Sequence, residues 1–306
     1  MNEIKETKRE KFGRIFGHLK IEILKPLIKI QAFFKKNNKS ERKSFYRKKL
    51  TEYQKKYLSR YLYVLSDQPQ SVKTKLNKTI WFCWLQGEEN APPIIANCLQ
   101  SIRRYCPDYE VVVLTEKNIK QYTDIPDYIY QKNKNGIITN TQFSDLLRLE
   151  LLTKNGGIWV DATVFLTEPL PKEITSSDFF SLHADSFVHC NSWLIKANAG
   201  NVFLEKLKRL MFSYWQYETK MLDYFLFHIF FDLLAESDEE CALIWRKTPV
   251  IYDDCYDLEH HYFDVFNEQE WQRIKQKTSI HKLSWKYKKQ PEPNTFLANF
   301  LNGKLN

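Results

Sequence analysis

The chain reads Asn-Gly-Gly-Ile-Trp-Val-Asp-Ala-Thr over residues 155–163, and this stretch decides the fold. The glycine pair ends a helix, and the short apolar strand that follows delivers Asp161 at its carboxyl end. In open α/β sheets, ligands bind in the crevice outside the carboxyl ends of the strands. Asp161, with the Thr163 hydroxyl two residues later, is therefore predicted to hold a divalent cation against a diphosphate.

A second carboxylate and a guanidinium come from the helix before this strand. Asp145 and Arg148 stand three residues apart in Ser-Asp-Leu-Leu-Arg, so both lie on one face of a helix. Two plainer interpretations exist: a helix stop followed by a strand-end carboxylate, and a surface ion pair that contributes little. The occurrence of both patterns close together in the chain favours one polar site.

The rest of the body follows an alternating strand and helix order. Residues 79–84 form a buried apolar run, residues 93–105 have apolar side chains at helical spacing, and residues 110–114 form a second strand. This order predicts a parallel strand pair with a right-handed crossover. Helix 141–154 and strand 158–160 complete a nucleotide-binding half-domain. Further elements are expected downstream: strands at 179–182 and 192–195, and helices at 202–217 and 222–236.

The composition predicts a globular protein of the cytosol. Hydrophobic residues make up 43% of the 306 residues, which suffices for a packed core. No apolar run approaches the roughly 18 residues of a transmembrane helix, and the start lacks a signal-peptide pattern. The six cysteines are scattered without metal-ligand spacing, which is typical of reduced thiols.

The positive charge of the chain belongs to its first segment. Residues 1–50 contain 16 Lys and Arg against 5 Glu, a net charge of +11, whereas the whole chain has +9 and the remainder therefore −2. A nucleic-acid-binding body would have its basic patch on the folded domain. We therefore expect no nucleic acid as a partner.

Residues 1–70 are predicted to form a basic helical extension, in which Pro26 kinks or splits a helix. A basic amphipathic helix of this kind lies on anionic membrane surfaces; the alternative is that its apolar stripe packs on the body. The body is expected to have its own core from Lys78 onward, over residues 71–290, followed by a tail, 291–306. The stripe consists of Ile15, Phe16, Leu19, Ile23, Leu24, Leu27, Ile28, Ile30, Phe33 and Phe34.

Four blocks in this order resemble a known family, the small DXD-containing sugar transferases of the capsular-polysaccharide-synthesis type. Its relatives are mannosyltransferases with a GG-x-Y-x-D-x-D signature and, more remotely, the catalytic domains of clostridial glucosylating toxins. The resemblance covers most of the body. The blocks are residues 80–87, 144–148, 156–163 and 280–283.

The resemblance implies a GT-A fold, a single Rossmann-like α/β domain. It also implies a nucleoside-diphosphate sugar donor, with UDP as the expected nucleotide, a Mn²⁺ or Mg²⁺ cofactor and retention of anomeric configuration. The implied enzyme is a bacterial-type hexosyltransferase that acts on a lipid-linked precursor of a surface or capsular polysaccharide. Its expected location is the cytoplasm, peripheral at the inner face of the cell membrane.

The resemblance also assigns roles at the donor site. Trp84 would stack on the base, with Gln86 beside it among the donor-binding residues. Asp145 and Arg148 would contact the donor sugar, and Asp161 would meet the metal or the ribose and diphosphate. The last three are the predicted catalytic residues. The alternative for Trp84 is an ordinary core tryptophan.

Two late residues complete the implied metal and diphosphate site. His281 resembles the histidine that closes the metal site in many GT-A enzymes, and Lys282 would contact the diphosphate. The metal ligands would thus be Asp161, Thr163 and His281. Thr163 stands where the usual motif has a second aspartate, and a neutral hydroxyl is a weaker ligand for a hard cation than a carboxylate.

Four further residues are candidates for binding the acceptor. Asn191 and Trp193 lie on the strand after the metal block, and Asp223 and His228 are polar residues in an aromatic helix. Burying such groups unpaired costs several kcal/mol, at the order of magnitude, so they are expected to have partners, catalytic or not.

Two other functions remain open. The Asp161 site also suits a metal-dependent nucleotide-sugar hydrolase or phosphotransferase, which would consume donor without any sugar acceptor. The chain could also be a non-catalytic binding protein of a polysaccharide assembly complex, with Thr163 marking a decayed site.

Overall fold

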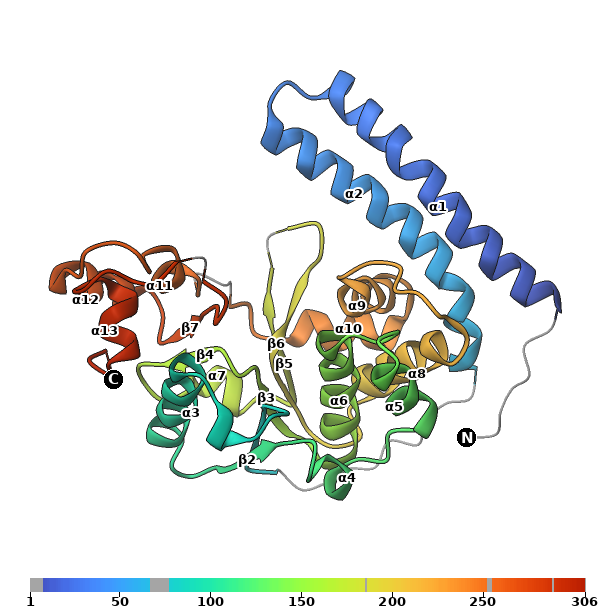
Figure 1. Cartoon of the computed structure of the whole chain (residues 1–306). Helices are drawn as coiled ribbons and strands as arrows, with labels where there is room; N and C mark the ends of the chain where they lie inside the picture. Colours follow the sequence, from blue (N-terminus) through green and yellow to red (C-terminus); the bar gives the residue numbers. More distant parts are fainter. Residues whose placement is uncertain (1–7, 67–76, 185, 252–254, 288, 306) are drawn as a thin grey trace.

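The computed structural model describes residues 8–66, 77–184, 186–251, 255–287 and 289–305. An α/β body carries a projecting hairpin of two helices, α1 (Lys8–Lys35) and α2 (Lys39–Leu58) (Figure 1). A 3₁₀ segment, Ser59–Leu65, follows α2 directly where the hairpin meets the body. The predicted α/β fold with a helical N-terminal lead-in is confirmed.

The body is built on a five-stranded sheet in the order β2-β1-β3-β6-β5. β1 pairs in parallel with both β2 and β3, and β6 is antiparallel to β3 and β5. α3 (Pro93–Tyr105) connects β1 to β2, so the predicted parallel pair with a helical crossover is confirmed. The strands are β1 (Thr79–Cys83), β2 (Glu110–Leu114), β3 (Gly157–Val160), β5 (Phe179–His183) and β6 (Cys190–Ala197).

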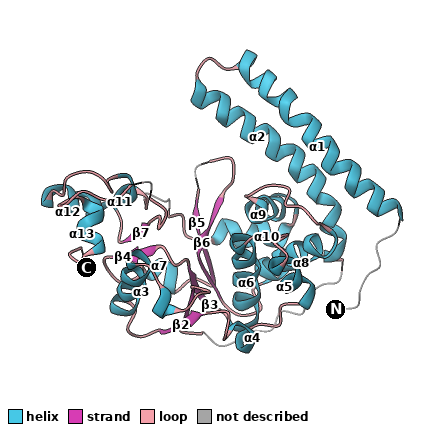
Figure 2. Cartoon of the chain, in the orientation of Figure 1, coloured by secondary structure: helices cyan, strands magenta, loops and turns pink. Residues whose placement is uncertain are grey.

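A second sheet pairs β4 (Val164–Leu166) with β7 (Ile280–Lys282) in antiparallel fashion. Helices cover both faces of the main sheet, as Figure 2 shows. The larger ones are α6 (Asn140–Asn155), α8 (Val202–Tyr217), α9 (Leu226–Ser237), α10 (Glu239–Lys247) and α12 (Glu268–Lys277). The shorter ones are α4 (Ile119–Tyr122), α5 (Asp127–Lys134), α7 (Lys172–Thr175), α11 (Asp257–His260), α13 (Phe296–Leu301) and the 3₁₀ turn Glu88–Asn90.

Alternation along the strands divides the core into two halves. Trp81 and Trp159 face the cluster that contains α6, α8 and α9, whereas Ile80, Phe82 and Ile158 face the cluster that contains α3. Successive strand residues point to opposite faces of a sheet. Both faces are therefore buried, as expected for a mainly parallel sheet centre.

The turn from α6 into β3 requires two glycines. Gly156 and Gly157 have φ angles of 69° and 104°, in the region that glycine adopts without steric cost. A Cβ on Gly157 would lie 2.5 Å from the Thr79 carbonyl oxygen, and one on Gly156 would lie 2.7 Å from the backbone nitrogen of Ala199. The glycine pair thus lets β3 pack against β1 and fixes where the chain emerges at Asp161.

The helical hairpin divides the predicted apolar stripe between two faces. α1 runs as one helix through Pro26, so the proline does not split it. Ile21, Ile28 and Ala32 are buried on the inner face. Among the described residues, no helix combines the length and apolarity needed to cross a bilayer. Leu24 is partly buried, and the other eight residues of the predicted stripe are at least half exposed: Ile15, Phe16, Leu19, Ile23, Leu27, Ile30, Phe33 and Phe34.

A buried carboxylate anchors the hairpin to the body. The Tyr57 and Tyr61 hydroxyls each donate to Glu218 at 2.7 Å, and Arg14 and His18 lie 3.1 and 3.0 Å from its second oxygen. Burial opposes ionisation of Glu218, but these hydrogen bonds lower its pKa to about 2. Removing residues 1–50 would therefore remove the Arg14 and His18 contacts of Glu218.

The predicted division into 1–70, 71–290 and 291–306 stays a prediction. The boundary at residue 70 lies outside the described residues. Within the predicted tail, α13 buries Phe296, Leu297 and Phe300 in the core on the α3 side of the sheet.

Candidate active site

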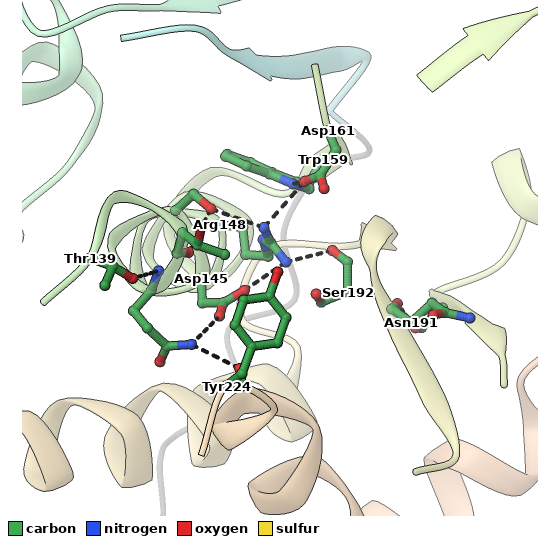
Figure 3. A network of polar contacts seen from close by, with 12 residues as sticks. Thr139, Asp145, Arg148, Trp159, Asp161, Asn191, Ser192 and Tyr224 are labelled. Atoms are coloured by element: carbon green, nitrogen blue, oxygen red, sulfur yellow. Dashed lines mark hydrogen bonds and ion pairs between the residues drawn. The ribbon is translucent and has the colours of Figure 1, made fainter. Parts of the chain in front are cut away.

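Two positive charges, those of Arg148 and Lys282, meet at Asp161, at the carboxyl end of β3; Figure 3 shows Arg148 beside Asp161. One carboxylate oxygen accepts from Trp159 Nε1 at 2.8 Å and from Arg148 at 3.2 Å. The other accepts from Lys282 Nζ at 3.1 Å, and the same ammonium donates to Thr163 Oγ1 at 2.7 Å. Residues from α6, from the loop after β3 and from β7 thus share one polar cluster.

Arg148 is the most constrained member of this cluster. Its guanidinium pairs with Asp145 at 2.8 Å, and it donates to the Ser192 carbonyl at 2.8 Å and to the Ser144 hydroxyl at 3.2 Å. The guanidinium also lies over the Trp159 ring, 5.0 Å from its centroid. The structure therefore brings together the two helix residues and the strand-end carboxylate that the sequence singles out.

The two carboxyl groups have opposite pKa shifts. Burial works against ionisation of Asp161, but Lys282, Arg148 and the hydrogen bond from Trp159 hold its pKa below the usual value. Burial raises the pKa of Asp145 to about 7, with Arg148 opposing the rise and the Asp161 charge adding to it. Burial thus dominates at Asp145 and the neighbouring cations dominate at Asp161, and opposite pKa shifts in one cluster are typical of active sites.

Trp84 lies just beyond the carboxyl end of β1, the strand next to β3. Its ring meets the Trp285 ring edge to face, with centroids 5.6 Å apart and planes at 90°. The buried Trp84 Nε1 has no hydrogen-bond partner among the described residues, while Gln86 is exposed in the following turn. Trp285 was missed as a site residue, although its place three residues after Lys282 is a usable signal.

His281 and Lys282 point to opposite faces of β7, as successive strand residues do. The His281 ring is fully buried between the Phe165 and Trp271 rings, with Nε2 3.3 Å from the Thr167 hydroxyl. Burial lowers its pKa to about 4, so the ring is neutral. The structure places His281 in the core, and no contact joins it to Asp161 within the described residues.

The predicted metal ligands do not fit a divalent cation held by the protein in this arrangement. Lys282 binds both Asp161 and Thr163, and the third predicted ligand, His281, faces the core. Among the described residues, no group of three or more His, Cys, Asp or Glu side chains could hold a metal ion. The Lys282 ammonium occupies the position between Asp161 and Thr163.

Of the four acceptor candidates, Trp193 contacts the cluster directly. The Lys282 ammonium lies 5.8 Å from the Trp193 ring centroid, and the Trp193 carbonyl accepts from the Asp161 backbone N–H at 2.9 Å. The His228 ring contacts the Phe225 and Phe227 rings edge to face, and burial together with the Arg148 charge lowers its pKa to about 4.

The other two candidates lie apart from the cluster. Asn191, on β6, points away from Arg148 (Figure 3). Asp223 has the partners that its burial requires: Arg47 donates to it at 3.2 Å and Gln54 at 3.0 Å, both from α2.

Two residues of the site were not predicted. The Gln142 amide donates to Asp145 at 3.3 Å and to the Tyr224 carbonyl at 3.1 Å, and the Tyr224 ring extends toward Arg148 (Figure 3). A helix was predicted from residue 222, but α9 begins at Leu226. The reason is that the Asp223 carboxylate accepts the Phe225 N–H at 3.0 Å and holds a turn there, which exposes Tyr224.

A family model described as capsular polysaccharide synthesis protein matches residues 27–300. The chain belongs to this capsular polysaccharide synthesis family. The family resemblance predicted from the four sequence blocks is thereby confirmed. The match extends from residue 27, near the end of α1, to α13, so the shared region includes α2 and the last part of α1.

Two individual proteins are similar to parts of this family member. The O-glycosyltransferase braB of Annulohypoxylon truncatum is 33% identical over 99 residues, which is 29% of this chain. The matched part covers 24% of that relative. Among solved structures, the PaToxG glycosyltransferase aligns with a TM-score of 0.38 and 14% identity, over 78% of this chain and 99% of that one.

Proposed function

We propose that the protein is a glycosyltransferase of the hexosyltransferase type. It moves a sugar from a nucleoside diphosphate, with UDP as the expected nucleotide, to a lipid-linked precursor of a surface or capsular polysaccharide. The observation that carries this proposal is the convergence of Arg148 and Lys282 on Asp161 at the carboxyl ends of parallel strands. That edge is where open α/β sheets bind nucleotides, and the family of the chain supports the assignment.

The transfer requires stabilisation of negative charge on the leaving group. An acceptor hydroxyl oxygen bonds to the anomeric carbon, the bond from that carbon to the diphosphate oxygen breaks, and the diphosphate keeps the electron pair. The acceptor proton passes to the departing phosphate, in keeping with retention of configuration. Lys282, fixed by Asp161 and Thr163, would supply a preorganised positive charge next to the diphosphate, which is usually a large contribution to catalysis.

The remaining residues would position the donor. The Trp84 and Trp285 rings, which meet edge to face, would contact the base. The buried Trp84 N–H, which has no hydrogen-bond acceptor among the described residues, would donate to it. Asp145 and Arg148, buried side by side, would hold the hydroxyl groups of the donor sugar. Correct placement of the reacting groups contributes several kcal/mol, on the order of 7–11 in favourable cases.

Calorimetric titration with UDP-, GDP- and dTDP-sugars, followed by turnover of the tightest donor, tests this function. We expect one nucleotide class to bind and the sugar to be released or transferred faster once a lipid extract with polysaccharide precursors is added. If the donor is consumed at the same rate with and without the lipid extract, the protein would instead be a nucleotide-sugar hydrolase or phosphotransferase. Binding without turnover under any condition would indicate a non-catalytic binding protein.

We further propose that the hairpin brings the enzyme to the anionic inner face of the cell membrane, where a lipid-linked acceptor lies. Eight large apolar side chains of α1, between Ile15 and Phe34, are at least half exposed. Lysines flank this face, and residues 1–50 have a net charge of +11. An amphipathic helix with these properties binds membranes through apolar burial and attraction to anionic lipids.

Replacing Leu19, Ile23 and Leu27 together by serine is expected to lower binding to phosphatidylglycerol vesicles by about tenfold or more, because each exposed apolar side chain contributes on the order of 1.5 kcal/mol when buried. Co-sedimentation at low and high salt measures the effect. The matched control replaces three exposed apolar residues of the body, Leu243, Val250 and Val265, by serine. Equal losses in both triple variants would contradict a membrane role for α1.

A further inference from the structure

A cavity of about 930 Å³ lies between the hairpin and the body. One wall comes from α2, and the other comes from two body segments, one at the tip of the β5–β6 hairpin and one just before α9. In Figure 1 the β5–β6 hairpin extends toward α2. The cavity thus forms only because the helical hairpin of α1 and α2 packs on the body.

The α2 wall is basic and hydroxylic. Ser40, Lys43, Ser44, Arg47 and Lys48 line it at intervals that place them on one helix face. Within the described residues no carboxylate pairs with Lys43 or Lys48. The nearby carboxylates have other partners: Glu41 accepts from Asn38, Glu52 pairs with Lys49 and Asp223 pairs with Arg47. Two free ammonium groups and two hydroxyl groups are suited to a ligand with several anionic oxygens.

Arg47 is fixed as a structural part of the cavity. It pairs with Asp223 at 3.2 Å, and its guanidinium lies 4.3 Å from the Phe187 ring centroid and 5.2 Å from that of Phe225. This pairing neutralises Asp223, the one carboxylate among the described residues that line the cavity. Among the described residues that line the cavity, Lys43 and Lys48 are therefore the charges without an opposite partner, and the Phe187 and Phe225 rings lie on the opposite wall.

Tyr224 connects the cavity to the Asp145–Arg148 pair. It lines the cavity, and its carbonyl accepts from Gln142, whose amide also donates to Asp145. Its ring extends toward Arg148 (Figure 3). A ligand held by the lysines would thus present its far end across Tyr224 to the proposed donor sugar.

We infer that this cavity binds the diphosphate of the lipid-linked acceptor, with Lys43 and Lys48 on its phosphates and the acceptor sugar over Tyr224. The inference rests on the proposed function for the identity of the ligand. It assigns the α2 face of the hairpin to the acceptor, while the exposed face of α1 is left for the bilayer. A prenyl chain attached to the diphosphate would leave the cavity on the membrane side of the hairpin.

Binding of farnesyl diphosphate, with farnesol as the uncharged probe, tests this inference in the full-length protein. We expect the diphosphate to bind and the double variant Lys43→Ala/Lys48→Ala to weaken it by about tenfold or more, the scale of lost charge-assisted hydrogen bonds. The matched control, Lys39→Ala/Lys56→Ala, removes the same charge from α2 outside the cavity. It should leave farnesyl diphosphate binding unchanged.

Three outcomes would overturn the inference. Farnesyl diphosphate could bind no more tightly than farnesol, or both double variants could weaken its binding equally. In the third outcome, Lys43→Ala/Lys48→Ala lowers binding to phosphatidylglycerol vesicles but not to farnesyl diphosphate. The last would assign the lysines to lipid headgroups. UDP binding should be the same in all these variants. If no nucleotide binds while farnesyl diphosphate still requires Lys43 and Lys48, the proposed transferase function fails and the cavity assignment stands.

Discussion

Asp161→Asn is expected to lower kcat for sugar transfer by about a hundredfold to a thousandfold, the range seen when one preorganised electrostatic contact of an active site is removed. The substitution keeps the shape of the side chain but removes the charge that both Arg148 and Lys282 contact. Lys282 would then lose its fixed position beside Thr163, and the leaving diphosphate would lose a preorganised cation. Initial rates with saturating donor measure the effect.

A charge-matched control separates this role from stability. Asp238 pairs with Lys206 at 2.8 Å and caps α10, neither of which belongs to the cluster, and asparagine also caps helices well. Asp238→Asn should leave kcat within about twofold, the scale of surface substitutions. Melting temperatures of both variants should stay close to that of the parent. Activity of Asp161→Asn within tenfold of the parent, at an unchanged melting temperature, would remove Asp161 from the active site.

The part of the site that the sequence predicts is local in the chain. The glycine pair, the strand that follows it and the helix pair Asp145 and Arg148 depend on neighbours within a few residues, and the structure has each where it was expected. Positive φ angles and helix periodicity are properties of short segments. They can therefore be inferred without knowledge of the fold.

The part that the sequence does not predict depends on strand register. Phe165 pairs with His281 and Val164 with Lys282, and a shift of one residue would exchange the faces of the two side chains. The resemblance implied both His281, as a metal ligand, and Lys282, as a contact of the diphosphate, whereas the register points only Lys282 to Asp161 and turns His281 into the core. Lys282 and Asp161 are 121 residues apart, so no local pattern could decide between them.

The same reason applies to the hairpin and to Tyr224. The amphipathic pattern of α1 predicted a helix, but it could not show that one face packs inward while the other is exposed. Glu218, which anchors both α1 and the end of α2, has no signature in the sequence. Gln142 and Tyr224 are 82 residues apart, and only the fold makes them neighbours.

Lys282→Met is expected to weaken UDP binding by about tenfold or more and to lower kcat by about a hundredfold, because a charge-assisted contact to the leaving diphosphate is lost. Methionine keeps most of the side-chain length, so the packing against Trp193 should persist. Lys275→Met is the matched control, since that ammonium also lies over a tryptophan, 5.2 Å from the Trp271 ring centroid, away from Asp161. Calorimetry with UDP and initial rates measure both effects.

The same experiment decides what supplies the positive charge. If the Lys282 ammonium does so, chelation with EDTA should leave UDP binding by the parent protein nearly unchanged, and Mn²⁺ should not restore the Lys282→Met variant. If a divalent cation does so, EDTA should weaken UDP binding by the parent as strongly as the substitution does. A cation that acts in place of Lys282 would have to displace its ammonium from Asp161 and Thr163, which Lys282 contacts at 3.1 and 2.7 Å. Chelation of the parent protein therefore separates the two possibilities, independently of any acceptor.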